Sequence, residues 1–142
     1  MADFLTSFRV TASGLAAQRL RLNIIAENVA NAQTTRTAEG GPYKRKDPVF
    51  AAKPFNEMLS REAVAGATGV SVERVHVDER PDRMQYDPSH PDANKDGYVA
   101  MPNIDMVTEM VNMMSASRSY ESNVSVLNAS KAMALKALEI GR

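Results

Sequence analysis

The residues whose types and spacing come closest to a chemical site lie in the segment 92–97 (DANKDG). Asp92, Asn94 and Asp96 alternate as the first oxygen ligands of an EF-hand calcium loop do, with Gly97 at the sixth position. The twelfth position is Asn103, whereas such a loop needs a glutamate that coordinates through both oxygens. Proline-rich sequence also precedes the loop where a helix should enter it. A calcium-binding module is therefore one alternative function, and we expect no bound metal or other cofactor.

A basic cluster between residues 36 and 46 (RTAEGGPYKRK) is the second candidate. Arg36, Lys44, Arg45 and Lys46 flank a Gly-Gly-Pro turn, and positive charge of this kind can contact phosphate groups. The cluster is short, contains a single aromatic residue, and belongs to a chain whose formal net charge is zero. A nucleic-acid-binding adaptor is the second alternative, but a solvated loop or a protein contact explains the cluster better. We therefore expect no nucleic-acid partner.

The other residues that could support catalysis do not form a site. The two histidines, His76 and His90, follow no usual metal-ligand spacing, and the lack of cysteine excludes disulfides and thiolate chemistry. No serine lies in a Gly-x-Ser-x-Gly setting, and no glycine-rich phosphate loop is present. Acidic residues near 78–96 lie in a proline-broken polar loop that offers no apolar pocket to raise a carboxyl pKa. The sequence predicts a protein that is not an enzyme.

The longest regular element is expected in the last quarter of the chain, over residues 105–140. This stretch contains no proline or glycine, and its apolar or small residues recur at alternating intervals of three and four, which is typical of a helix packed lengthwise on another. Asn103 or Asp105 is the expected N-cap. At 1.5 Å per residue the helix extends roughly 50 Å. The expected seam consists of Met106, Met110, Met113, Ser117, Tyr120, Val124, Leu127, Ala134 and Leu138, and only Lys131 interrupts it.

A second long helix is expected near the N-terminus, over residues 3–31, as the partner of the first. Its apolar residues also keep a heptad spacing, and they are Phe4, Phe8, Leu15, Leu22, Ile25 and Val29. Gly14 interrupts this pattern, either as a tolerated glycine or as a point of close helix approach. Asn28 and Asn31 lie where the helix should end, and we expect them to cap it.

The chain between the two helices predicts a small β-containing insert. Strands are expected at 49–51, 70–77 and 97–101, and a short helix at 55–65. The alternation of residues 70–77 changes phase, which predicts a bulge near Glu73–Arg74. The expected fold class is α+β, with an antiparallel, coiled-coil-like helical hairpin around the insert. The expected divisions are 1–33, 34–102 and 103–142.

The C-terminal helix carries more apolar surface than one partner can cover. Val107, Val111, Met114 and Leu135 lie off its seam, so the hairpin is expected to assemble rather than to remain alone. No apolar run is long enough to span a bilayer, and the N-terminal residues lack the pattern of a cleaved signal peptide. If the protein leaves the cytoplasm, we expect a route that keeps its N-terminus intact.

Four groups of residues, in order along nearly the whole chain, resemble signatures of a known family. The first group lies in and after the N-terminal helix, the next two in the insert, and the last in the C-terminal helix. They are Ser13, Gly14, Leu15, Asn28 and Asn31; Gly40, Gly41, Pro42 and Tyr43; Tyr86, Asp87, Pro88, His90 and Pro91; and Arg118, Tyr120 and Glu121. Together they resemble the bacterial flagellar axial proteins of the rod and hook, and among these the basal-body rod proteins.

The resemblance implies a structural subunit of the proximal rod in the flagellar basal body. It implies export by the flagellar type III apparatus with an uncleaved N-terminus, and helical assembly in the periplasm with copies of itself and other rod proteins. The terminal helices would then form an inner tube around the export channel. The expected helix-packing and subunit-interface residues are Phe8, Leu15, Leu22, Ile25, Val29, Met110, Met113, Tyr120, Val124, Leu127 and Leu138.

Overall fold

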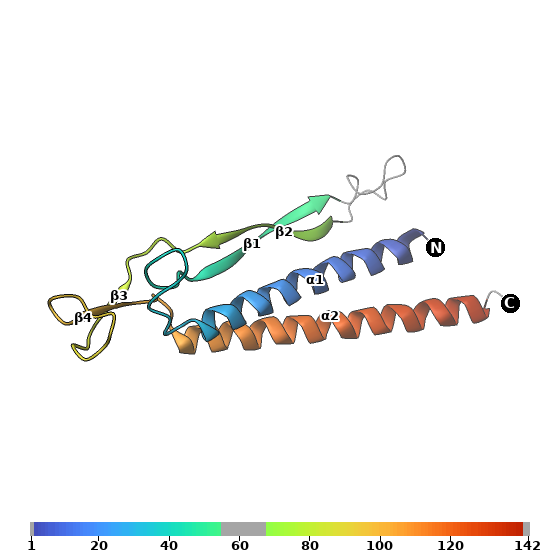
Figure 1. The fold of residues 1–142 in the computed structure, drawn as a ribbon. Helices are drawn as coiled ribbons and strands as arrows, with labels where there is room; N and C mark the ends of the chain where they lie inside the picture. The colour runs from blue at the N-terminus through green and yellow to red at the C-terminus, as the bar shows by residue number, and fades with distance from the viewer. Residues whose placement is uncertain (1, 55–67, 141–142) are drawn as a thin grey trace.

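Two long helices form an antiparallel pair whose free ends lie at the same end of the molecule (Figure 1). The computed structural model describes residues 2–54 and 68–140, so the helix predicted at 55–65 lies outside the described residues. Helix α1 spans Ala2–Ala30 and α2 spans Met106–Ile140, each within about one residue of the predicted bounds. The sheets lie between them in sequence, which confirms the α+β class.

Helix α2 begins immediately after a side-chain cap. The backbone N–H of Val107 donates to Oδ1 of Asp105 over 3.2 Å, and the hydroxyl of Thr108 donates to Oδ2. These bonds, Thr108 first and Val107 second, hold the pKa of the Asp105 carboxyl below its usual value. Of the two predicted caps, Asp105 is therefore the one that the helix uses.

A long β-hairpin lies along α1 on the side away from α2. Strand β1 spans Lys46–Pro54 and pairs antiparallel with β2, which spans Thr68–Val77. Val49 pairs with Arg74 and the next residue, Phe50, pairs with Val72, so Glu73 is the extra residue of a bulge. The predicted bulge is confirmed. Helix α1 thus forms the middle layer between the hairpin and α2 (Figure 1).

A shorter sheet projects past the end of the helix pair (Figure 1). Strand β3, Arg83–Tyr86, pairs with β4, Tyr98–Met101. β4 was expected, but the sequence indicated a loop where β3 lies, since four residues carry too little alternation to predict a strand. Gly97 adopts a left-handed φ of 79°, and a Cβ there would lie 2.9 Å from the Tyr86 ring. Only glycine fits this turn without displacing Tyr86.

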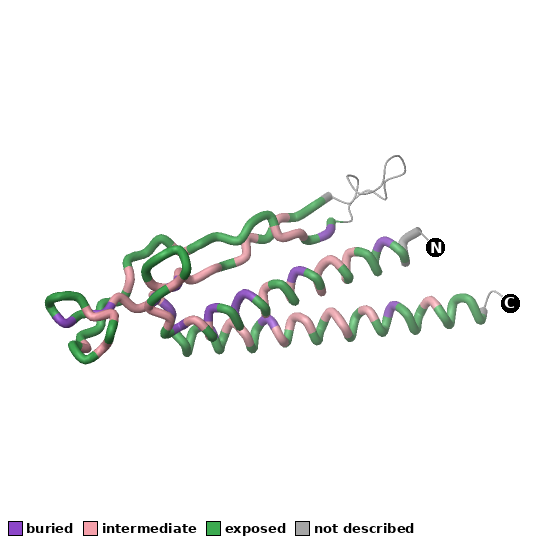
Figure 2. The backbone as a smooth tube through the Cα atoms, viewed as in Figure 1, coloured by how far each residue is buried: buried purple, intermediate pink, exposed green. Residues whose placement is uncertain are grey.

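The buried residues are few and are concentrated where the helices meet the insert. Ala32, Tyr43 and Ile104 form a cluster at this junction. Figure 2 shows buried segments thinly spaced along α1 and α2, with exposed segments covering most of the outer surface of α2. The described part of the molecule is therefore a thin rod, whose small core holds one end of the helix pair together.

Candidate assembly surface and polar cluster

The most deeply buried residues of α2 are small or polar. The fully buried residues of α2, among those described, are Glu109, Ala116 and Ser130. On α1, which packs against both α2 and the β-hairpin, Ala17, Ile24 and Ile25 are buried. Each of the three buried residues of α2 comes one position before a predicted or interrupted seam position, which are Met110, Ser117 and Lys131. The buried side of α2 is therefore rotated from the predicted seam.

The opposite side of α2 is apolar and exposed in its first two turns. Val107, Met110, Val111 and Met114 are between 52% and 70% exposed, and we refer to these four as the outer stripe. Because a helix turns by about 100° per residue, the stripe points away from Glu109 and Ala116. Farther along α2, Met133, Leu135 and Leu138 are also more than half exposed. Exposed apolar surface gathered in this way marks a contact site.

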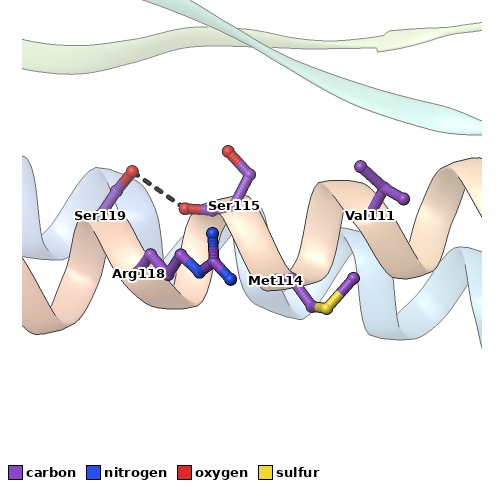
Figure 3. Close-up of a pocket in the computed structure, with 5 residues that line it drawn as sticks. All are labelled: Val111, Met114, Ser115, Arg118 and Ser119. Atoms are coloured by element: carbon purple, nitrogen blue, oxygen red, sulfur yellow. Dashed lines mark hydrogen bonds between the residues drawn. The ribbon is translucent and has the colours of Figure 1, made fainter.

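A shallow hollow lies at the edge of the outer stripe (Figure 3). It is lined by Val111, Met114, Ser115, Arg118 and Ser119, all from α2. The hydroxyl of Ser119 donates to the backbone carbonyl of Ser115 over 3.0 Å, so the polar group of Ser119 is satisfied by the helix itself. The guanidinium of Arg118 extends along the helix toward Met114 (Figure 3). The hollow thus offers apolar contact bordered by one cationic donor.

The predicted interface residues divide into three groups by exposure. Ile25 is buried, and the half-buried group consists of Leu15, Leu22, Val29, Met113, Tyr120, Val124 and Leu127. Phe8, Met110 and Leu138 are exposed to 39%, 52% and 60%. These three are little covered within the single chain, so their role as subunit-interface residues stays a prediction. Apolar periodicity assumes that the most apolar stripe of a helix faces the nearest helix, whereas the most deeply buried residues of α2 are a paired carboxylate, an alanine and a serine.

Asn28 is the centre of a buried polar cluster at the junction of α1, α2 and β1. Its Oδ1 accepts from the Tyr43 hydroxyl (3.1 Å) and from the Lys46 backbone N–H (2.9 Å). Its Nδ2 donates to the Lys46 carbonyl (2.8 Å) and to Oε2 of Glu109 (3.2 Å). The amide therefore makes four hydrogen bonds and is fully buried. The predicted capping role is wrong for Asn28, but Asn31 does bond the Glu27 carbonyl over 2.9 Å.

Glu109 brings a buried charge into this cluster. Its carboxylate is 1% exposed and accepts from Nε of Arg45 over 2.8 Å in addition to Asn28. Arg45 also donates to Asp47 over 3.1 Å. A buried carboxylate is tolerated only when paired and hydrogen-bonded in this way. Sequence reasoning missed this role, although an acidic residue within an apolar helix was a signal for it. We refer to Asn28, Tyr43, Arg45, Lys46 and Glu109 as the Asn28 cluster.

Tyr43 is a buried member of this cluster. Burial, followed by the nearby carboxylate of Glu27, raises the pKa of the Tyr43 hydroxyl to about 12. The Lys46 ammonium lies 5.5 Å from the Tyr43 ring centre and also pairs with Glu27. Gly40 and Gly41, with φ of 90° and 75°, form the turn that brings Tyr43 back to α1. The Gly-Gly-Pro-Tyr motif therefore positions a buried tyrosine.

Two adjacent residues of α1 hold the layers on either side of it. Oγ of Ser13 accepts from the Val70 N–H of β2 over 3.0 Å and donates to the Val10 carbonyl. At Gly14, a Cβ would lie 3.3 Å from Nδ2 of Asn123 on α2. Of the two roles considered for Gly14, the structure shows a close helix approach.

The basic residues of the segment 36–46 each face a carboxylate. Arg45 pairs with Glu109, Lys46 with Glu27, and Lys44 with Asp82. Arg36, which is largely exposed, lies 3.9 Å from Asp92. Each positive charge is thus balanced locally, which leaves little basic surface for phosphate contacts.

Hydrogen bonds within the loop 87–97 and one from Thr35 hold its shape. Oδ1 of Asn94 accepts from the N–H groups of Asp96 and Tyr98, and Oδ2 of Asp92 accepts from the Thr35 hydroxyl. Nδ1 of His90 accepts from the Asp92 N–H, while His76 lies on an exposed part of β2. Within residues 2–54 and 68–140, no three His, Asp or Glu residues gather as a metal site.

Neither described helix has an apolar stretch that could cross a bilayer.

The comparison with known proteins matches both ends of the chain and its full length. Residues 8–36 match the family described as flagella basal body rod protein, and residues 95–140 match the C-terminal family of the flagellar basal body rod proteins FlgE, FlgF and FlgG. A flagellar basal-body rod protein FlgC of Borreliella burgdorferi is 42% identical, with 95% of each chain covered. The chain belongs to the FlgC family. FlgC proteins of Bacillus subtilis (42%, covering 96% of this chain and 97% of the relative) and Salmonella typhimurium (44%, covering 97% and 98%) are similarly close.

Membership of the FlgC family shows the general role of the chain. FlgC proteins are structural proteins of the flagellar basal-body rod, not enzymes, and the chain has this role. The two matched regions contain residues 8–30 of α1 and the whole of α2, which includes Glu109 of the Asn28 cluster and the outer stripe. The functional surface of this FlgC family member is therefore sought on its helices.

Proposed function

We propose that the chain is a subunit of the proximal rod that assembles helically with copies of itself and with other rod proteins through α1 and α2. In this proposal the helices line the inner tube around the export channel, and the tube acts as part of the drive shaft. The observation that carries it is the outer stripe: α2 is apolar on a side that no described part of the chain covers. Contacts that repeat without closing into a ring generate such a tube.

The exposed area gives the proposal its driving force. Each side chain of the outer stripe is about half exposed or more, so covering it would contribute on the order of 1 kcal/mol per residue. Met110 and Met114 have flexible side chains that can adapt to neighbours of different sequence. Packed helix interfaces deform little, which is what a shaft under torsion needs.

Export without loss of the N-terminus is the second part of the proposal. Helix α1 supplies Asn28 and Ser13, which hold α2 and the β-hairpin, so a subunit without α1 would lose both contacts. We propose the flagellar type III export apparatus as the partner for this step and the periplasmic rod as its destination. Mass spectrometry of the subunit from purified basal bodies should find N-terminal peptides from α1. A subunit that begins after α1 would contradict this route.

The test of the assembly surface is Met114→Asp in a strain that carries this chain as its only copy. A carboxylate at the centre of the outer stripe should stop rod assembly and swimming, because it would be buried without a partner. The matched control is Ser122→Asp, which places the same charge at an exposed position two turns farther along α2.

Two measurements separate an assembly defect from a folding defect. Circular dichroism of the purified variant should match that of the parent, since Met114 is exposed in the single chain. Electron microscopy of basal bodies should show no complete rods. Normal rods with Met114→Asp, or equal loss with Ser122→Asp, would contradict the outer stripe as the assembly surface.

A further inference from the structure

The buried residues that α2 brings to its contact with α1 are small or polar, so their shapes define the register of the helix pair only weakly. The buried residues of this contact include Ala17 on α1 and Ala116 and Ser130 on α2, which are small enough to fit against each other at several heights. Antiparallel helices with a heptad pattern can slide by one heptad and bring equivalent positions together again. Some other contact must choose among these registers.

Two specific contacts satisfy this need at different heights. Nδ2 of Asn28 donates to Glu109 over 3.2 Å, and Gly14 leaves space for Asn123, whose Nδ2 would lie 3.3 Å from a Cβ at residue 14. Gly14 precedes Asn28 by two heptads on α1, and Asn123 follows Glu109 by two heptads on α2. Because the helices are antiparallel, one register satisfies both contacts together.

A slip of one heptad would break both contacts. It moves one helix about 10 Å along the other, which takes Glu109 out of reach of Asn28 and Arg45. The carboxylate is 1% exposed, so its lost partners would not be replaced by bulk water without opening the junction. Asn123 would meet Arg21 or Ser7 instead of the one residue without a side chain.

We propose that Asn28–Glu109 and Gly14–Asn123 are the contacts that select the register of the helix pair. Buried polar residues are known to fix register in coiled coils even where they add little stability. The Asn28–Glu109 contact also couples the register to the position of the insert, because Asn28 bonds the backbone of Lys46 at the start of β1. As a consequence that rests on the proposed function, the register sets the height of the outer stripe relative to α1 and the β-hairpin.

The experiment measures the register directly in the full-length chain. The sequence contains no cysteine, so spin labels can be attached to Asn23→Cys and Asn128→Cys without background. Both positions are exposed and lie far apart in height, so a slip along the axis changes their separation. Double electron–electron resonance of the labelled parent should give one dominant distance.

The test variant combines Asn28→Leu, Glu109→Leu and Asn123→Ala in the labelled chain. Replacing both members of the buried pair by apolar residues of similar size leaves neither member of the pair unpaired, while Tyr43, Arg45 and Lys46 lose their bonds to it. A second distance, shifted by up to about 10 Å, is expected beside the first. The matched control is Ile25→Ala, which removes buried apolar volume, lowers the unfolding midpoint and should keep the single parental distance.

Other outcomes would overturn the inference. A single parental distance in the triple variant would show that other residues define the register. A loss of every defined distance in that variant would show that these contacts hold the helices together instead of choosing their height. A broad distribution in the parent would show that the free chain has no fixed register to select. The variant Glu109→Gln, which retains the oxygen and the size, should keep the parental distance.

Discussion

On the side of α2 that faces α1, the fully buried residues are Glu109, Ala116 and Ser130, whereas the opposite side exposes the outer stripe of valines and methionines. A helix in an isolated globule usually shows the reverse distribution. The polar side is tolerated because Arg45 and Asn28 neutralise and bond the one buried carboxylate. No described part of the chain covers the apolar side. This comparison of the two sides supports the proposal that the outer stripe is an assembly surface.

The largest expected effect comes from placing a charge at the flank of the seam. Leu127 is half-buried beside α1, and Leu127→Asp should abolish rod assembly, because a carboxylate would enter a contact that holds no partner for it. Motility assays and electron microscopy of basal bodies measure the effect. Ser125→Asp, at an exposed position of the same helix, is the control. Swimming cells with Leu127→Asp would show that this part of α2 stays outside the packed contacts.

Two neighbouring residues test the two sides of α2 against each other. Glu109→Ala should lower the free energy of unfolding of the free chain by about 3 kcal/mol, because it leaves Arg45 and Asn28 without their buried partner. Met110→Ala should change it by no more than about 0.5 kcal/mol, since Met110 is 52% exposed. Urea denaturation followed by circular dichroism measures both. Equal losses for the two variants would remove the distinction between the sides.

The burial of the Tyr43 hydroxyl can be tested through the pH dependence of the free energy of unfolding. The Tyr43 pKa lies at about 12 in the folded chain against the ordinary value of 10.0, so between these values only the unfolded chain has lost the proton. The free energy of unfolding should therefore fall as pH rises from 10 to 12, while below pH 10 the contribution is fully present. Denaturation of the parent and of Tyr43→Phe across this range measures it. The variant should show a flatter dependence, and parallel curves would place water at the cluster.

The smallest effect is expected at the start of α2, where the helix is stabilised locally. Asp105→Ala removes the oxygens that cap Val107 and Thr108, and it should cost about 1 kcal/mol of unfolding free energy. Asp105→Asn should recover most of this loss, because its amide oxygen can still accept the capping bond. Thermal unfolding measures both variants. A loss in Asp105→Asn as large as in Asp105→Ala would assign the effect to charge instead of capping.

Much of the fold follows from local signals in the sequence. The absence of proline and glycine over residues 106–140 and the Asp105 cap predict α2, and the change of phase before Val75 predicts the bulge at Glu73. The bounds of β1 were less accessible, because Pro48 and Pro54 lie in it. A two-stranded hairpin leaves outer edges unpaired, and there a proline costs no ladder bond. β3 was missed because it is defined by its pairing with β4, which local sequence does not show.

The candidate site divides in the same way. That α2 carries more apolar surface than α1 can cover follows from Val107, Val111 and Met114 in the sequence alone. Which side of α2 meets α1 does not follow, because hydrophobic periodicity measures where apolar residues lie and cannot show that Glu109 will find Arg45 from a distant loop. The sequence by itself determined two long helices, a small insert and a need for partners, through spacing and capping. Only the tertiary structure decided the seam, because the buried carboxylate of Glu109 depends on partners that the fold brings from α1 and from the loop before β1.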